Sequence, residues 1–166
     1  MSKFSNETLN PGEHFTYEGI EWICLDIING NYLAVTAKPW AEIPFDTNNH
    51  NDWQKSSLRR VLNNDFLDTL DRKLLMRQAP DLPAGGTDYV TLLSYKQYSQ
   101  YQNFIPTYSI AIWTLTPWQW YSFCTRVIVP PRYVSYSNVT YSNGVIPVCL
   151  FSSKISNCTV EYLRRL

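Results

Sequence analysis

The sequence predicts a β-rich α+β fold with an N-terminal hairpin, a short helical pair and a mainly antiparallel sheet. Two Asn-Gly pairs, at 29–30 and 143–144, lie between runs of β-branched and aromatic residues, a pattern typical of β-hairpins. From Ser56 to Leu75 the apolar residues change to helical spacing. A chain of 166 residues with 45% hydrophobic content fits one domain with an ordinary core.

The first part of the chain is predicted to be a hairpin followed by a loop. Residues 20–28 alternate imperfectly between apolar and polar side chains and are rich in β-branched residues, which favours a strand. Asn29 and Gly30 both tolerate a positive φ, so they predict a tight turn into a returning strand over residues 32–37. Residues 39–51 are then expected to form a loop.

Two short helices are predicted next. The first begins at Ser56 and ends at Asn63-Asn64, and Asp65 is expected to cap the second, in which Asp68 faces Arg72 one turn on. Residues 80–88 form a loop, whose paired glycines indicate flexibility because the Lys-Ser or Lys-Thr of a phosphate loop is missing. The apolar positions with helical spacing are Leu58, Val61, Leu62, Phe66, Leu67, Leu70, Leu74 and Leu75.

A buried strand and a third helix are predicted before the tryptophan-rich stretch. Residues 89–93 are apolar and β-branched, which is typical of a buried strand. Ser94 and Gln97 have the spacing of a capping box, so a short helix should begin there. This helix carries Tyr95, Tyr98 and Tyr101.

The last part of the chain is predicted to consist of strands. Residues 122–129 form a strand that ends at two prolines, and residues 132–141 form the next. Asn143-Gly144 is expected to turn the chain into a closing strand over residues 145–151. Pro147 lies inside this strand, which implies a sheet edge or a bulge.

The charge balance excludes several classes of partner. Fourteen basic and fourteen acidic residues give zero net charge, so no global field draws the chain to nucleic acid or an anionic membrane. No segment approaches the roughly 20 apolar residues of a membrane span, and the N-terminus lacks the apolar run of a secretory signal. We therefore expect a cytoplasmic protein, or a virion-associated one if it belongs to a phage particle.

Neither a catalytic residue, nor a metal site, nor a cofactor is predicted. Four cysteines are widely spaced and lack a nearby histidine pair, so they are expected to be buried thiols rather than zinc ligands or a redox pair. His14 and His50 are far apart in the sequence, and no hydrolase, zinc-protease or phosphate-loop motif occurs. The cysteines are Cys24, Cys124, Cys149 and Cys158.

Residues 113–121 contain three of the six tryptophans and are the first candidate binding stretch. Large rings at this density cannot all be fully buried, because each indole N–H needs a partner, so some should line a surface. The alternative is that Trp113 and Trp120 are core rings of a β-rich domain. We expect Trp113, Trp118, Trp120 and Tyr121 to contribute to ligand binding.

Residues 132–143 are the second candidate stretch, because Tyr, Ser and Asn dominate it as they do antibody paratopes. Tyrosine gives a large contact area at low rotamer cost, and Ser and Asn give adaptable hydrogen bonds. The alternative is an ordinary exposed hairpin. Tyr133, Tyr136 and Tyr141 are added to the candidate site, whose partner would be a host or bacterial protein or a glycan. The oligomeric state is not predicted.

The order of motifs resembles a family of uncharacterised domains of C-type-lectin-like fold, common in gut bacteria and their phages. That family is related in architecture to formylglycine-generating enzymes and to the variable proteins of diversity-generating retroelements. The resemblance runs through nearly the whole chain and is most specific around Trp53, which precedes a Ser-x-Leu-Arg motif, a Leu-Asn pair and a phenylalanine. The matching residues are Trp22, Leu25, Trp53, Ser56, Leu58, Arg59, Leu62, Asn63, Phe66, Leu92, Leu93 and Ser94.

Two departures from the family pattern stand at Leu115 and Ile146, where the family usually has arginine. The two segments should lie near one another in the family's fold. We therefore expect apolar packing to replace a shared polar arrangement, with a changed ligand site. The calcium-binding motifs of sugar-binding lectins are also missing from the sequence.

The resemblance and the aromatic stretches together imply a non-enzymatic binding protein encoded by a phage or prophage. One alternative is a cytosolic phage inhibitor of a host defence protein, whose zero net charge excludes DNA mimicry. Another is an enzyme of formylglycine-generator type, which would need reactive thiols at Cys149 and Cys158. An apolar strand around Cys149 should instead raise the pKa of its thiol, and Cys158 should be the accessible cysteine.

Overall fold

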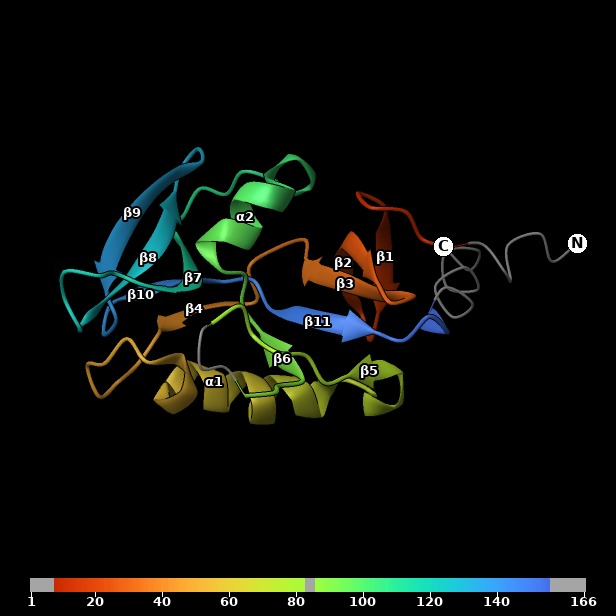
Figure 1. Cartoon of the computed structure of the whole chain (residues 1–166), viewed down its shortest axis with the longest axis horizontal. Helices are drawn as coiled ribbons and strands as arrows, with labels where there is room; N and C mark the ends of the chain where they lie inside the picture. The colour runs from red at the N-terminus through yellow and green to blue at the C-terminus, as the bar shows by residue number, and fades with distance from the viewer. Residues whose placement is uncertain (1–7, 83–85, 156–166) are drawn as a thin grey trace, which may run out of the picture.

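The computed structural model describes residues 8–82 and 86–155, which form a β-rich α+β fold (Figure 1). Two sheets lie side by side along the long axis, with helical segments below and above them in this view. The strands are β1 (His14–Tyr17), β2 (Ile20–Ile28), β3 (Asn31–Thr36), β4 (Ala41–Pro44), β5 (Leu75–Met76), β6 (Val90–Thr91), β7 (Ile112–Pro117), β8 (Cys124–Val129), β9 (Tyr133–Asn138), β10 (Ser142–Val145) and β11 (Val148–Phe151). The helical segments are η1 (Trp53–Lys55), α1 (Ser57–Val61), η2 (Leu62–Phe66), η3 (Leu67–Thr69), η4 (Arg72–Leu74), α2 (Tyr95–Tyr101) and η5 (Gln102–Phe104).

The first sheet has the order β1-β2-β3-β11-β5, with β6 also paired to β11, and every pairing is antiparallel. The predicted hairpin is confirmed, because Asn29 and Gly30 turn the chain with φ values of 51° and 80°. Trp22 to Leu25 are all buried, since core residues cover both faces of β2. This double burial explains why the strand alternates imperfectly in sequence.

The second sheet has the order β4-β10-β7-β8-β9 and is mixed, because β10 and β7 run parallel. β4 lies within residues 39–51, which were predicted to be a loop, and that prediction was wrong at Ala41–Pro44. Residues 41–44 carry only a weak local strand pattern. They become a strand because β10 pairs with them in the folded chain.

The second predicted hairpin was wrong. Asn143 and Gly144 lie inside β10 rather than in a turn, and β10 pairs with β4 and β7. The predicted closing strand over residues 145–151 is divided at Pro147, where the chain crosses from the second sheet to the first. β11 then pairs on both sides, so it is not an edge strand.

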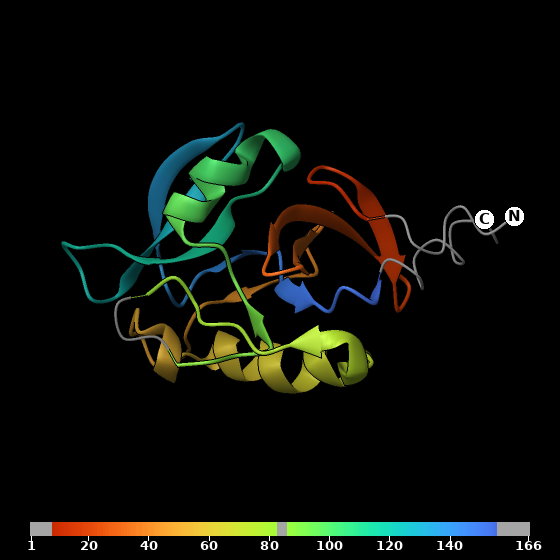
Figure 2. The same cartoon turned by 45° about the vertical axis from the view of Figure 1, so that its right-hand side comes forward.

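The predicted helical pair is one continuous helical stretch, α1 to η3, along the lower side of Figures 1 and 2. Asn63 and Asn64 do not end a helix, because the backbone stays helical through them to Thr69. Their side-chain amides donate back to the carbonyls of Arg59 and Arg60 at 3.0 and 2.6 Å. Asp65 consequently lies inside a π-helical turn and caps nothing. The predicted ion pair between Asp68 and Arg72 is confirmed at 2.7 Å.

The third predicted helix is confirmed as α2, including its capping box. The Ser94 hydroxyl accepts from the Gln97 amide at 3.0 Å, and the Gln97 side chain accepts from the Ser94 amide at 3.0 Å. The strand predicted over residues 89–93 is shorter, since only Val90–Thr91 forms β6.

Two apolar clusters fill the molecule. The larger lies between the α1–η3 stretch and both sheets, and the smaller packs beneath α2. Leu115 belongs to the larger cluster and Ile146 to the smaller, and both are buried. Their segments adjoin through the parallel pairing of β7 and β10. Apolar packing at both positions is therefore confirmed.

Candidate binding surface

The loop between β7 and β8, residues 118–123, projects from the left-hand end of the molecule in Figures 1 and 2. The Trp118 amide donates to the Cys124 carbonyl at 3.0 Å, and the Cys124 amide donates to the Tyr121 carbonyl at 3.1 Å. The side-chain amide of Asn51 donates to the carbonyls of Cys124 and Tyr121 at 2.8 and 3.2 Å. Its backbone amide donates to the Ser122 carbonyl at 2.8 Å. A distant segment thus fixes the loop.

Aromatic rings of this loop stack on one another and on β9. Trp118 and Tyr136 are nearly parallel, with centroids 4.8 Å apart and planes 13° apart. Tyr121 stacks on Phe123 at 5.2 Å and lies 6.5 Å from Tyr136. We call these four rings, together with the exposed Trp120 of the same loop, the aromatic face.

Much of the aromatic face is exposed. Trp120 is 69% exposed, and Tyr121 and Tyr136 are about half exposed. Single exposed apolar residues are ordinary, but adjoining ones mark an interaction surface in a folded protein. Aromatic rings are also the side chains most enriched at the centre of protein interfaces.

Arg126 contacts the aromatic face through Trp118. It lies on β8 opposite Tyr136, and its guanidinium carbon is 5.5 Å from the ring centroids of both Tyr95 and Trp118. Its Nε is buried and makes no hydrogen bond within the described residues. The guanidinium thus contacts one ring of α2 and one ring of the aromatic face, and it links Trp118 to the start of α2.

The structure brings together only part of the predicted site. Trp118, Tyr121 and Tyr136 contact one another in the aromatic face, and Trp120 is exposed on the same loop. Trp113, by contrast, is 1% exposed and donates its indole N–H to the Ile43 carbonyl at 2.9 Å. Its inclusion in the binding site is corrected, because a side chain on the inner face of β7 cannot reach a ligand.

Tyr133 and Tyr141 are well exposed but stand apart from the stacked rings. Neither contacts another ring within the part of the chain that the structure describes. Side chains alternate along a strand, so Tyr133 and Tyr136, three residues apart on β9, point to opposite faces of the sheet. Tyr133 therefore does not enlarge the surface to which Tyr136 belongs.

Sequence reasoning missed four contributors to this surface. Phe123 looked like an ordinary strand residue, and Arg126 and Tyr95 come into contact only when α2 packs on the second sheet. Asn51 is 70 residues from Tyr121, whose carbonyl it binds. No local sequence pattern predicts such a contact. The pairing of β8 with β9, which places Arg126 opposite Tyr136, could have indicated that a cation lies beside the aromatic rings.

The residues of the resembling motif form a structural network away from the aromatic face. The buried carboxylate of Asp88 accepts from the Trp53 indole at 3.0 Å and from Arg59 Nε at 2.8 Å. Ser56 caps α1, and Asn63 binds the backbone of Val90 through both its donor and its acceptor. This network holds the helix against β6.

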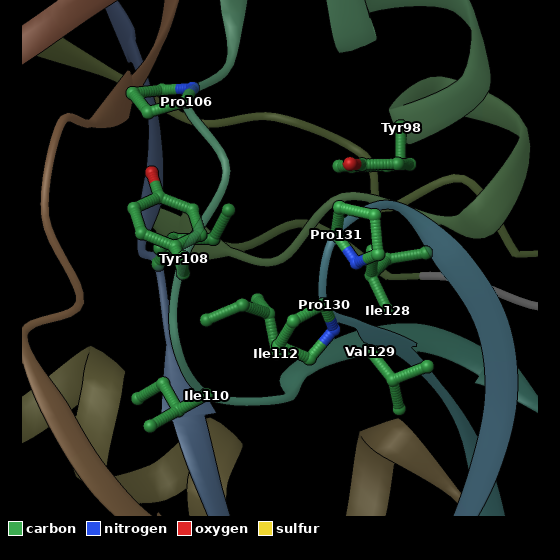
Figure 3. A pocket seen from close by; sticks show the side chains of 10 residues that line it. Tyr98, Pro106, Tyr108, Ile110, Ile112, Ile128, Val129, Pro130 and Pro131 are labelled. Carbon is green, nitrogen blue, oxygen red and sulfur yellow. The ribbon is translucent and has the colours of Figure 1, made fainter.

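Three hollows are lined by described residues. Figure 3 shows an apolar one between Tyr98, Tyr108 and the two prolines that end β8, but its volume of about 10 Å³ holds about one water molecule. A hollow of about 350 Å³ is lined by Glu21, Lys38 and Trp40 among others, and one of about 270 Å³ lies beside Trp53 and Leu115. Neither lining contains a nucleophile paired with a base.

The described thiols are unsuited to nucleophilic or metal chemistry. Cys24, Cys124 and Cys149 are free and buried. Burial raises the pKa of Cys149 strongly, as predicted, and raises the pKa of Cys24 to about 11 and that of Cys124 as well. The prediction that Cys158 is accessible lies outside the described residues. Within residues 8–82 and 86–155, no group of three or more His, Cys, Asp or Glu could hold a metal ion.

The two histidines do not meet either. His14 lies in β1, and its Nδ1 is 2.9 Å from the carboxylate of Glu21 at an exposed position. Among the described helices, none is long and apolar enough to cross a membrane.

No family model matches the chain, and no curated protein and no solved structure matches it either.

Proposed function

We propose that the protein is a non-enzymatic binding protein that recognises a macromolecule through the aromatic face. The observation that carries this proposal is the set of adjoining exposed rings on a loop that Asn51 and Arg126 hold in place. Leaving such rings in water is unfavourable, and a partner that covered them would remove that cost.

Preorganisation supports the proposal. The mutual stacking of Trp118 on Tyr136 and of Tyr121 on Phe123 limits the rotamers of four rings before any partner arrives. Binding then loses less side-chain entropy, which is one of the main costs of association. An enzyme would need a nucleophile paired with a base, and the linings of the two larger described hollows hold no such pair.

A protein partner fits this surface better than a glycan. A sugar ring stacks on a free aromatic face, whereas four of the five rings in the aromatic face already stack in pairs. Trp120 is the exception, because it is the most exposed and makes no ring contact within the described residues. A ring of this kind suits the pocket of a protein partner as an anchor.

The resemblance supplies the finer part of the proposal. We infer a C-type-lectin-like fold and a phage or prophage origin from the motif order around Trp53, Arg59 and Asn63. The support is that these motif residues are joined, directly or through Asp88, into one network that holds α1 to β6. The partner would then be a protein of the bacterial host.

An affinity capture with matched variants tests the proposal. The wild-type chain, Trp120→Ala and Met76→Ala would each be immobilised and exposed to lysate of the bacterium that carries the gene, and to an array of cell-wall glycans. Met76 is an exposed apolar residue on β5, so its variant controls for general stickiness. We expect a protein captured by wild type and Met76→Ala and lost with Trp120→Ala. Equal capture by all three chains would reject the aromatic face as the site.

A further inference from the structure

β9 is an edge strand with an open outer side. It is the last strand of the second sheet and pairs only with β8. The Val139 amide donates to the Phe123 carbonyl at 2.9 Å, so the odd-numbered residues of this strand face β8 with their backbone groups. The N–H and C=O groups of Val134 and Tyr136 therefore point outward.

These outward groups are unpaired. No hydrogen bond joins the backbone of Val134 or Tyr136 to any other described residue. The next outward residue, Asn138, already accepts at its carbonyl from the Tyr141 amide at 3.0 Å. Val134 and Tyr136 thus offer two backbone N–H donors and two backbone C=O acceptors to another strand.

β9 also lacks the features that keep edge strands from pairing. Natural edges are protected by lysine or other charged side chains, by proline, by bulges or by a covering element. β9 reads Tyr-Val-Ser-Tyr-Ser-Asn, with neither charge nor proline, and it pairs with β8 in unbroken register. It lies at the outer margin of the molecule in Figures 1 and 2.

We propose that β9 is the interface for a second copy of this chain, which adds its own β9 antiparallel across a two-fold axis at Ser135. In this register Val134 faces the partner's Tyr136, and Tyr136 faces the partner's Val134. The two pairs make four backbone hydrogen bonds and use every unpaired group of the two residues. Ser135 faces the partner's Ser135.

Side-chain chemistry favours a second copy as the occupant. Valine opposite tyrosine is a stabilising cross-strand pair, and it occurs twice in this register. Tyr133 faces the partner's Ser137, so two large rings do not collide there. The strand is uncharged and the whole chain has zero net charge, so two copies do not repel one another.

This inference goes beyond the proposed function, because association through β9 requires no other partner. Pairing places Tyr136 of the aromatic face beside the partner's Val134 and leaves Trp120 and Tyr121, on the β7–β8 loop, outside the strand contact. The two aromatic faces would then lie on one continuous sheet.

Cross-linking of Ser135→Cys in the full chain tests the register. Directly opposite residues in a non-hydrogen-bonded antiparallel pair have Cα atoms about 4.5 Å apart, within the range that a disulfide spans. Ser137→Cys is the matched control, since the two copies of residue 137 would lie about 13 Å apart along the strands. Under mild oxidation we expect Ser135→Cys to form a disulfide-linked dimer roughly tenfold faster than Ser137→Cys.

Val134→Pro tests the hydrogen bonds. Proline there removes an outward N–H and leaves the ladder to β8 complete, so it should abolish the Ser135→Cys cross-link. If near-ultraviolet circular dichroism shows that Val134→Pro is unfolded, Val134→Lys is used in its place. The lysine adds a charge to the edge of β9 and should also abolish the cross-link. Peptide mapping locates the disulfide. Equal cross-linking of Ser135→Cys and Ser137→Cys, absence of cross-linking, or cross-linking that survives both Val134 substitutions would each overturn the proposal.

Discussion

Asp88 shows how much one buried side chain contributes to this fold. Its carboxylate is 3% exposed and accepts from both the Trp53 indole and the Arg59 guanidinium. Asp88→Ala would leave a buried indole N–H and a half-buried cation without their acceptor. We expect the free energy of unfolding in urea to fall by about 2 kcal/mol.

Asp68→Ala is the matched control for this substitution. It also removes a carboxylate from an arginine, but the Asp68 and Arg72 side chains are 68% and 52% exposed. Exposed ion pairs contribute less than about 1 kcal/mol. Equal losses for the two variants would show that the Asp88 network is not the stabilising unit inferred here.

The pH dependence of stability follows from the buried thiols. The pKa of Cys24 rises from 9.0 to about 11, because burial disfavours its thiolate. Between these values the unfolded chain has released the proton and the folded chain still binds it. The contribution of the protonated Cys24 thiol to the free energy of unfolding is therefore complete below pH 9 and is lost as the pH rises toward 11. Denaturant titrations of wild type and Cys24→Ala should show a steeper alkaline loss for wild type; parallel curves would contradict this.

At the residue scale, sequence reasoning succeeded for composition and failed for orientation. It identified a tryptophan-rich stretch as partly exposed, but it could not tell Trp113 from Trp120. Their exposed fractions are 1% and 69%. The difference arises because Trp113 lies on a strand whose inner face meets Ile43, whereas Trp120 lies on the loop that follows.

At the element scale, the loop of residues 118–123 depends on Asn51. Asn51→Ala removes the side-chain hydrogen bonds to the carbonyls of Trp118, Tyr121 and Cys124 and leaves the β8–β9 ladder intact. We expect hydrogen–deuterium exchange to become faster at residues 118–124 and to stay unchanged in β9. Asn64→Ala, which removes an exposed asparagine that bonds only within its own helical stretch, serves as the control and should leave the loop unchanged.

Gly144 explains why the second hairpin prediction failed. A Cβ at this position would lie 2.6 Å from Ile112 Cδ1 and 3.1 Å from the Ala111 carbonyl oxygen. The glycine is therefore needed for the close approach of β7 to β10, whereas Gly30 has the positive φ of a true turn. The same dipeptide thus serves two purposes, and only the tertiary structure distinguishes them.

Gly144→Ala should consequently be destabilising. The added methyl group must displace Ile112 and strain β7, which we expect to lower the free energy of unfolding by about 1–3 kcal/mol. Gly86→Ala is the control, because among the described residues its new Cβ would meet only Gln54 Oε1, at an ordinary 3.5 Å. Thermal unfolding of both variants measures the difference, and an unchanged midpoint for Gly144→Ala would contradict the close packing described here.

At the scale of the whole molecule, the fold class was predictable but the assembly of the site was not. Periodicity identified the β-rich α+β class, the first hairpin and α2, since these depend on neighbours in sequence. The aromatic face combines rings of the β7–β8 loop and of β9, and Asn51 fixes that loop. These segments are brought together by the strand order of the second sheet. Sheet order depends on long-range pairing, which local patterns do not encode.

If the aromatic face carries the affinity for a macromolecular partner, Trp120→Ala should raise the dissociation constant of the complex. The Trp120 ring is 69% exposed and makes no ring contact within the described residues, so its removal should leave the free energy of unfolding unchanged. With the partner captured by wild type, we expect binding to weaken by about 2 kcal/mol or more, as for a central aromatic anchor, and Met76→Ala to bind like wild type. A dissociation constant for Trp120→Ala equal to that of wild type would contradict the claim.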